Sequence, residues 1–101
     1  MPAEVDALEA ARLVHDGAVL VDVREDDEWA AGHAPYALHA PMSRLRNELD
    51  ALPTDRLLVC ICHVGQRSAA VAAALENAGY DTVNAAGGMQ AWEAAGLPVV
   101  T

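Results

Sequence analysis

The sequence predicts an α/β fold in which a mostly parallel sheet is flanked by helices. Apolar runs at residues 18–23 and 57–61 are typical of strands buried on both faces, as the strands of parallel sheets are. Strand and helix patterns alternate along the chain with short connections. The 101 residues, of which 53% are hydrophobic, suit one compact domain spanning residues 1–101.

Capping and helix-breaking residues divide the first half of the chain. Asp6 is expected to cap a helix over residues 7–15, which Gly17 ends. Ser43 is expected to cap a helix through about residue 52, which Pro53 stops. Between these two helices the expected elements are, in order, a strand at 18–23, a short helix at 25–31 and a short strand at 37–40.

The second half of the chain begins with the strand at 57–61, which leads into a loop at 62–67. An Ala-rich helix is expected over 68–78, with Gly79 just past its end. A short strand at 82–84 and a last helix at 88–95 complete the series. In open parallel sheets the ligand site lies beyond the carboxyl ends of the strands, so the loop at 62–67 is the expected site.

Charge and composition exclude several classes of function. The net charge is −9, and all basic residues are Arg, which disfavours nucleic acid and anionic membranes as partners. Any anion must therefore be bound by local groups. The N-terminus lacks the basic and apolar regions of a signal peptide, and no apolar run is long enough to span a bilayer. We expect a cytoplasmic protein, and the acidic surface favours a monomer.

The two cysteines, Cys60 and Cys62, are separated by one residue, a spacing too tight for an easy disulfide. Two thiols with the adjacent His63 do not make a metal site. Cys60 lies inside the apolar run and is expected to be a core thiol, with a resolving thiol as the alternative. Cys62 follows the run and is the candidate nucleophile.

The loop after the strand has the features of an anion cradle. A buried strand leads in and a helix leads out, so backbone N–H groups and the positive end of the helix dipole converge on Cys62. Gly65 permits the backbone conformation that such a curl needs. A thiolate there is stabilised, and so is a persulfide. The expected substrate-binding residues are the rest of the loop: His63, Val64, Gly65, Gln66, Arg67 and Ser68.

Three segments resemble the rhodanese-like sulfurtransferases. Cys62-x-x-Gly65-x-Arg67-Ser68 is similar to the active-site loop of that family. Residues 21–35 are similar to its first signature, and residues 87–99, which begin Gly-Gly, to its C-terminal one. The three occur in the family's order and together span nearly the whole chain.

The resemblance implies a small five-stranded parallel sheet flanked by helices on both faces, and a ping-pong reaction. Cys62 would take a sulfane sulfur from a donor such as thiosulfate and pass it, as a persulfide, to cyanide or a thiol, which a partner protein could carry. No metal or organic cofactor is implied. Two departures are His63, where the family often has a more basic residue, and Tyr36, where it usually has glycine. We expect the turn at Tyr36 to differ, because tyrosine adopts a positive φ only at a cost.

The neighbouring charged residues have two readings. Arg67 either binds the substrate anion through its guanidinium or braces the loop. Asp22 and Arg24 are expected to support the site through an ion-pair network with Glu28, in preference to direct catalysis. Four further residues are expected to be structural: His33, His39, Trp29 and Trp92.

Three rival functions remain. Cysteine phosphatases have a Cys-x5-Arg loop, whereas here four residues separate Cys62 from Arg67, a tighter ring that suits one sulfur better than a phosphoryl group. A sulfur carrier or sensor loaded by a partner protein would use the same residues. An inactive interaction module is disfavoured because the cysteine is present.

Overall fold

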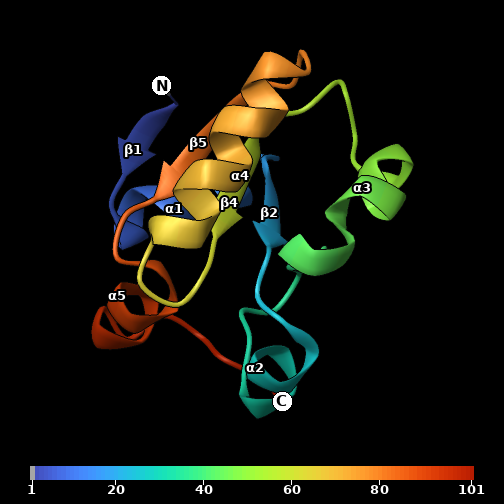
Figure 1. Cartoon of the computed structure of the whole chain (residues 1–101). Helices are drawn as coiled ribbons and strands as arrows, with labels where there is room; N and C mark the ends of the chain where they lie inside the picture. Colours follow the sequence, from blue (N-terminus) through green and yellow to red (C-terminus); the bar gives the residue numbers. More distant parts are fainter. Residues whose placement is uncertain (1) are drawn as a thin grey trace.

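The computed structural model describes residues 2–101 and contains one five-stranded sheet, in which all paired strands are parallel (Figure 1). The strand order is β1-β5-β4-β2-β3, so β4 lies at the centre. The strands are β1 (Ala3–Val5), β2 (Val19–Asp22), β3 (Leu38–His39), β4 (Leu58–Ile61) and β5 (Thr82–Ala85). This arrangement confirms the predicted α/β class.

Helices cover both faces of the sheet. The α-helices are α1 (Ala7–His15), α2 (Asp26–Ala31), α3 (Leu45–Glu48), α4 (Gln66–Asn77) and α5 (Gly88–Ala94). In Figure 1, α4 lies in front of β4 and β5, and α1 lies behind them. The short helix α2 follows β2 beyond the carboxyl edge of the sheet, where the site is expected.

Alternating residues of β4 pack into two separate hydrophobic cores, one on each face of the sheet. Leu58 and Cys60 belong to the core that includes residues of α4, whereas Val59 and Ile61 belong to the core that includes residues of α1 and α5. All four residues of the strand are buried, which explains the unbroken apolar run in the sequence. Cys62 continues the first set, so its side chain belongs to the α4 core.

Three local expectations were wrong. The strand β1 was not anticipated, because three residues with two exposed side chains carry little pattern. The helix expected from Ser43 to residue 52 is instead a 3-10 turn, one α-helical turn and a second 3-10 turn. Ser43 does not cap it, because its hydroxyl donates to the Glu25 carboxylate. Helix α4 begins two residues earlier than expected, at Gln66.

The turn at Tyr36 keeps a positive φ of 68° in spite of its side chain. The ring is 90% exposed, so no packing opposes that conformation and only the backbone cost remains. Tyr36 therefore adopts the positive φ at its backbone cost, and the expectation of a turn different from the family's stays a prediction. No helix within residues 2–101 has the length and apolar character needed to cross a membrane.

Candidate active site

The sulfur of Cys62 lies just beyond the carboxyl end of β4, in the loop that leads into α4. The residue is 1% exposed, and its sulfur accepts hydrogen bonds from the Gly65 N–H at 3.1 Å and the Ser68 hydroxyl at 3.3 Å. Gly65 reaches this geometry with a φ of 103°, in the left-handed region that favours glycine. The curl therefore depends on a residue without a side chain.

The electrostatic environment favours the thiolate of Cys62. Burial of the sulfur opposes its ionisation and is the largest single effect. The Ser68 hydroxyl and the backbone N–H groups of Ser68, Gly65 and Arg67 act in the opposite direction. Together these donors outweigh burial and hold the pKa of Cys62 below its ordinary value.

The carbonyl groups of the loop are bound by helix α5. Met89 N–H donates to the Cys62 carbonyl at 2.7 Å, and Gln90 N–H donates to the His63 carbonyl at 3.0 Å. A Cβ on Gly88 would overlap these two carbonyl groups, so only glycine permits the approach. Gly88 thus allows α5 to approach and bind the carbonyls of the loop, whereas a Cβ on Gly87 would overlap Ala91 of the same helix. Sequence reasoning found this motif but not its role.

Arg67 is held by Glu28 of α2. Both terminal nitrogens of the guanidinium donate to the Glu28 carboxylate at 2.7 Å. The hydrogen bond to Arg67 is the main reason that the pKa of Glu28 is lowered to about 2, against an opposing effect of burial. The structure therefore favours the bracing role for Arg67. It also places Glu28 opposite Arg67, and the charge of Arg24, without a hydrogen bond to Glu28, further lowers the pKa of that carboxyl.

Asp22 and Arg24 form a separate buried ion pair. Arg24 Nη2 lies 2.8 Å from the Asp22 carboxylate, and it also donates to the Gly32 carbonyl at 2.7 Å. His39 Nε2 lies 2.8 Å from the Arg24 carbonyl. These bonds fix the segment that connects β2 to α2, and so the position of Glu28.

The rim of the site is open. His63, Val64 and Gln66 are exposed, whereas Gly65 and Ser68 are buried beneath them. The exposed side chains of the loop therefore surround a sulfur that is itself buried. Among residues 2–101, no group of three His, Cys, Asp or Glu side chains could hold a metal ion.

Cys60 is a core residue. It is fully buried in β4, and burial raises the pKa of its thiol to about 12. A thiol that resists ionisation is a poor nucleophile, so the geometry favours the core role over that of a resolving thiol.

The two tryptophans, Trp29 and Trp92, differ in burial and in the groups that they contact. Trp92 is buried, and its indole N–H donates to the Pro98 carbonyl, consistent with packing. Trp29 is only partly buried, and its ring stacks with that of His33, at 3.6 Å between ring centroids, and with that of His39, at 4.4 Å. The expected core packing of Trp29 is therefore replaced by stacking with two histidine rings.

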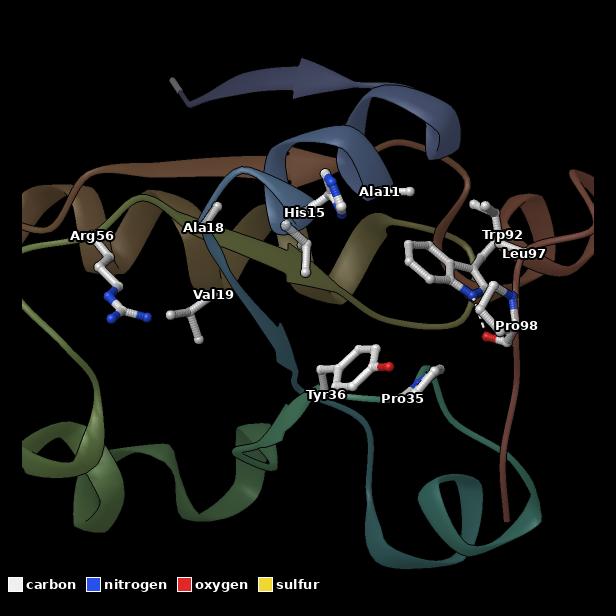
Figure 2. A pocket seen from close by; sticks show the side chains of 12 residues that line it. Ala11, His15, Ala18, Val19, Pro35, Tyr36, Arg56, Trp92, Leu97 and Pro98 are labelled. Carbon is white, nitrogen blue, oxygen red and sulfur yellow. Dashed lines mark hydrogen bonds between the residues drawn. The ribbon is translucent and has the colours of Figure 1, made fainter.

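A groove of the described chain lies elsewhere. Figure 2 shows a groove of about 530 Å³ bordered by α1, the turn at Tyr36 and the segment after α5. Trp92 and Val14, which line it, belong to the core opposite that of Cys62. Cys62 is not among the residues that line this groove.

Comparison with known proteins places these features in a family. A family model described as a rhodanese-like domain matches residues 6–95. The Bacillus subtilis protein YtwF is 45% identical over 74 residues, which are 73% of this chain and 72% of YtwF. A sulfurtransferase of Allochromatium vinosum is 37% identical over 100 residues, which cover 96% of this chain and 94% of the relative. The crystal structure of a rhodanese-related protein from Thermoplasma volcanium has a TM-score of 0.90 at 32% identity and covers 97% of both chains.

Proposed function

This chain belongs to the rhodanese-like family, and we propose that it transfers a sulfane sulfur through a persulfide on Cys62. A relative that is matched over nearly its whole length is a sulfurtransferase, which supports the proposal at the level of the family. The observation that carries the proposal is the sulfur of Cys62, buried and yet surrounded by donors that lower its pKa. Such a cradle stabilises one small anionic sulfur and does so again after the persulfide has formed.

The proposed reaction has two steps. The Cys62 thiolate attacks the outer sulfur of thiosulfate, a new S–S bond forms, and the old S–S bond breaks so that sulfite leaves with the electron pair. The terminal sulfur of the persulfide then carries the negative charge. An acceptor such as cyanide or a thiolate attacks that sulfur, the bond to Sγ breaks, and the Cys62 thiolate is restored.

The ion pair between Arg67 and Glu28 favours a sulfur donor other than thiosulfate. Because Glu28 takes one N–H of each terminal nitrogen and offsets the guanidinium charge, Arg67 attracts a dianion such as thiosulfate less strongly than an unpaired arginine would. His63 is the other basic side chain of the loop, and it is exposed. A low-molecular-weight or protein persulfide, which carries less charge, therefore suits the site, as it would in a sulfur carrier.

A phosphatase is the less suitable reading. The ring of N–H groups spans only four residues between Cys62 and Arg67, and the Gly65 N–H and Ser68 hydroxyl already converge on the sulfur itself. Hydrolysis of an aryl phosphate above the level of a Cys62→Ser variant would reverse this ranking.

Intact mass spectrometry tests the proposal directly. Wild type, Cys62→Ser and Cys60→Ser are incubated with thiosulfate or with a small persulfide, and then with cyanide. We expect a gain of about 32 Da, one sulfur atom, on wild type and Cys60→Ser only, and its removal by cyanide. A gain from the persulfide alone would favour the carrier. A gain on Cys62→Ser, or none on wild type from either donor, would refute the role of Cys62.

A further inference from the structure

Asn84 of β5 makes contacts that link the reactive loop to two strands. Its side chain is 1% exposed, and its amide nitrogen donates to the Gly65 carbonyl at 3.0 Å and to the Glu4 carboxylate at 2.6 Å. Asn84 is paired in register with Cys60 on one side and with Glu4 on the other. One amide therefore joins the edge strand β1, the strand β5 and the loop that holds the sulfur.

The hydrogen bonding of Asn84 does not favour a purely stabilising role. Both amide hydrogens are used, but Oδ1 is buried without a hydrogen-bond partner in residues 2–101. A buried polar atom without a partner costs stability, so an apolar side chain of similar shape would be tolerated here. The amide orientation is set by Glu4, because a carboxylate must face the NH₂ group and not Oδ1.

The Gly65 carbonyl has two donors that hold it to different elements. Ala69 N–H, at 3.2 Å, ties it to helix α4, whereas Asn84 ties it to the sheet. Because glycine has no side chain to restrict it, the orientation of its two peptide groups depends on such bonds. The N–H of the same residue points at the Cys62 sulfur at 3.1 Å. The carbonyl belongs to the peptide group after Gly65 and the N–H to the one before it, so the bonds to the carbonyl restrain the N–H only through the φ and ψ of this one residue.

We propose that Asn84 is a positioning residue for sulfur transfer, which aims the Gly65 N–H at the Cys62 sulfur and is itself oriented by Glu4. This inference rests on the proposed function, since it assigns Asn84 a purpose only if Cys62 is the reactive thiol. Asn84 does not touch the sulfur, and it acts through the backbone of Gly65.

The test measures the titration of Cys62 through the pH dependence of its alkylation by iodoacetamide. All variants carry Cys60→Ala, so that a single thiol is titrated. Asn84→Leu removes both bonds and the unpartnered oxygen while Ala69 still binds the Gly65 carbonyl, so the fold is expected to persist. The pH midpoint of Cys62 alkylation should rise by about 0.5 to 1 pH unit. This is less than the effect of losing a whole hydrogen bond to a charged group, because the Gly65 N–H is misaligned and not removed.

Thr82→Val is the matched control. Thr82 lies on the same strand, is buried and donates to a main-chain carbonyl of α4, that of Ala72, at 3.0 Å. Loss of this hydrogen bond in Thr82→Val should lower the midpoint of urea unfolding and leave the pH midpoint of Cys62 alkylation unchanged. An equal shift in Thr82→Val and Asn84→Leu, or none in Asn84→Leu, would overturn the proposal.

Glu4→Ala supplies an independent test on an exposed residue, and it decides the matter if Asn84→Leu does not fold. Removal of a negative charge by itself would lower the midpoint for Cys62, whereas loss of positioning raises it. A rise smaller than that of Asn84→Leu is expected, and a fall would refute the role of Glu4. Alkylation needs no sulfur donor, so the two proposals can fail separately. The expected titration shifts in a protein that transfers no sulfur would refute only the proposed function. Sulfur transfer without those titration shifts would refute only the role of Asn84.

Discussion

Substitution of Gly88 by alanine tests whether helix α5 holds the reactive loop in place. Gly88 has a φ of 55°, and its added Cβ would overlap the backbone of Cys62 and His63. Gly96, at the other end of the same helix, has a φ of 76°, but an added Cβ there meets nothing within 4 Å. The two substitutions share the backbone cost of a positive φ and differ in the overlap.

The expected magnitudes follow from that comparison. Gly96→Ala should cost about 1 kcal/mol, the price of a left-handed alanine. Gly88→Ala adds the loss of the bonds from Met89 and Gln90 to the loop, about 1 kcal/mol each, for a total of about 3 kcal/mol. Urea unfolding gives the stabilities, and the rate of persulfide formation should fall in Gly88→Ala alone. Equal stabilities and equal rates in the two variants would refute this account of the paired glycines.

Four further substitutions test the site and its surroundings. Cys60→Ser should keep sulfur transfer but lower the free energy of unfolding by about 1–2 kcal/mol, because it buries a hydroxyl; inactivity would make Cys60 the nucleophile. Ser68→Ala should raise the alkylation midpoint of Cys62 by about one unit, since a donor to the thiolate is lost. Glu28→Gln should lower stability at pH 7 by about 1 kcal/mol, a modest value because the paired side chains are 30% and 37% exposed. The pKa of Glu28 is depressed from 4.5 to about 2, so wild type should lose this contribution as the pH falls through that window, and a pH-independent difference between the two proteins would contradict the assignment. His63→Arg should raise the rate with thiosulfate if local charge limits it, and an unchanged rate would exclude His63 as the limiting feature.

The central elements could be predicted because burial on both faces leaves a strong pattern. The runs at 18–23 and 57–61 became β2 and β4, and Asp6 caps α1 as expected, accepting from the Glu9 N–H. Edge elements carry less information. The strand β1 has a single half-buried side chain and is held mainly by its main-chain pairing with β5.

The convergence of the loop on the Cys62 sulfur was predictable from the sequence, whereas the residues that support the loop were not. Cys62, Gly65 and Ser68 are neighbours in sequence, so their convergence could be expected from one loop. The bond between Glu28 and Arg67 joins residues 39 positions apart, and that between Glu4 and Asn84 joins residues 80 apart. Such pairs depend on strand order and register, which a single sequence does not specify. The Gly87–Gly88 pair was the available signal, because adjacent glycines before a helix indicate a close backbone approach.

The site shows how an acidic protein can stabilise an anion. The net charge of −9 repels anions at long range, and the guanidinium groups of Arg24 and Arg67 are each paired with a carboxylate. The local attraction therefore comes from uncharged donors, of which the Gly65 N–H and the Ser68 hydroxyl lie within 3.3 Å of the sulfur. Such dipoles act at short range, so they favour one sulfur atom at the centre of the ring over a large, multiply charged group. Their strength depends on fixed orientation, which explains why the loop is held by α5 on its carbonyl side and by β5 at Gly65.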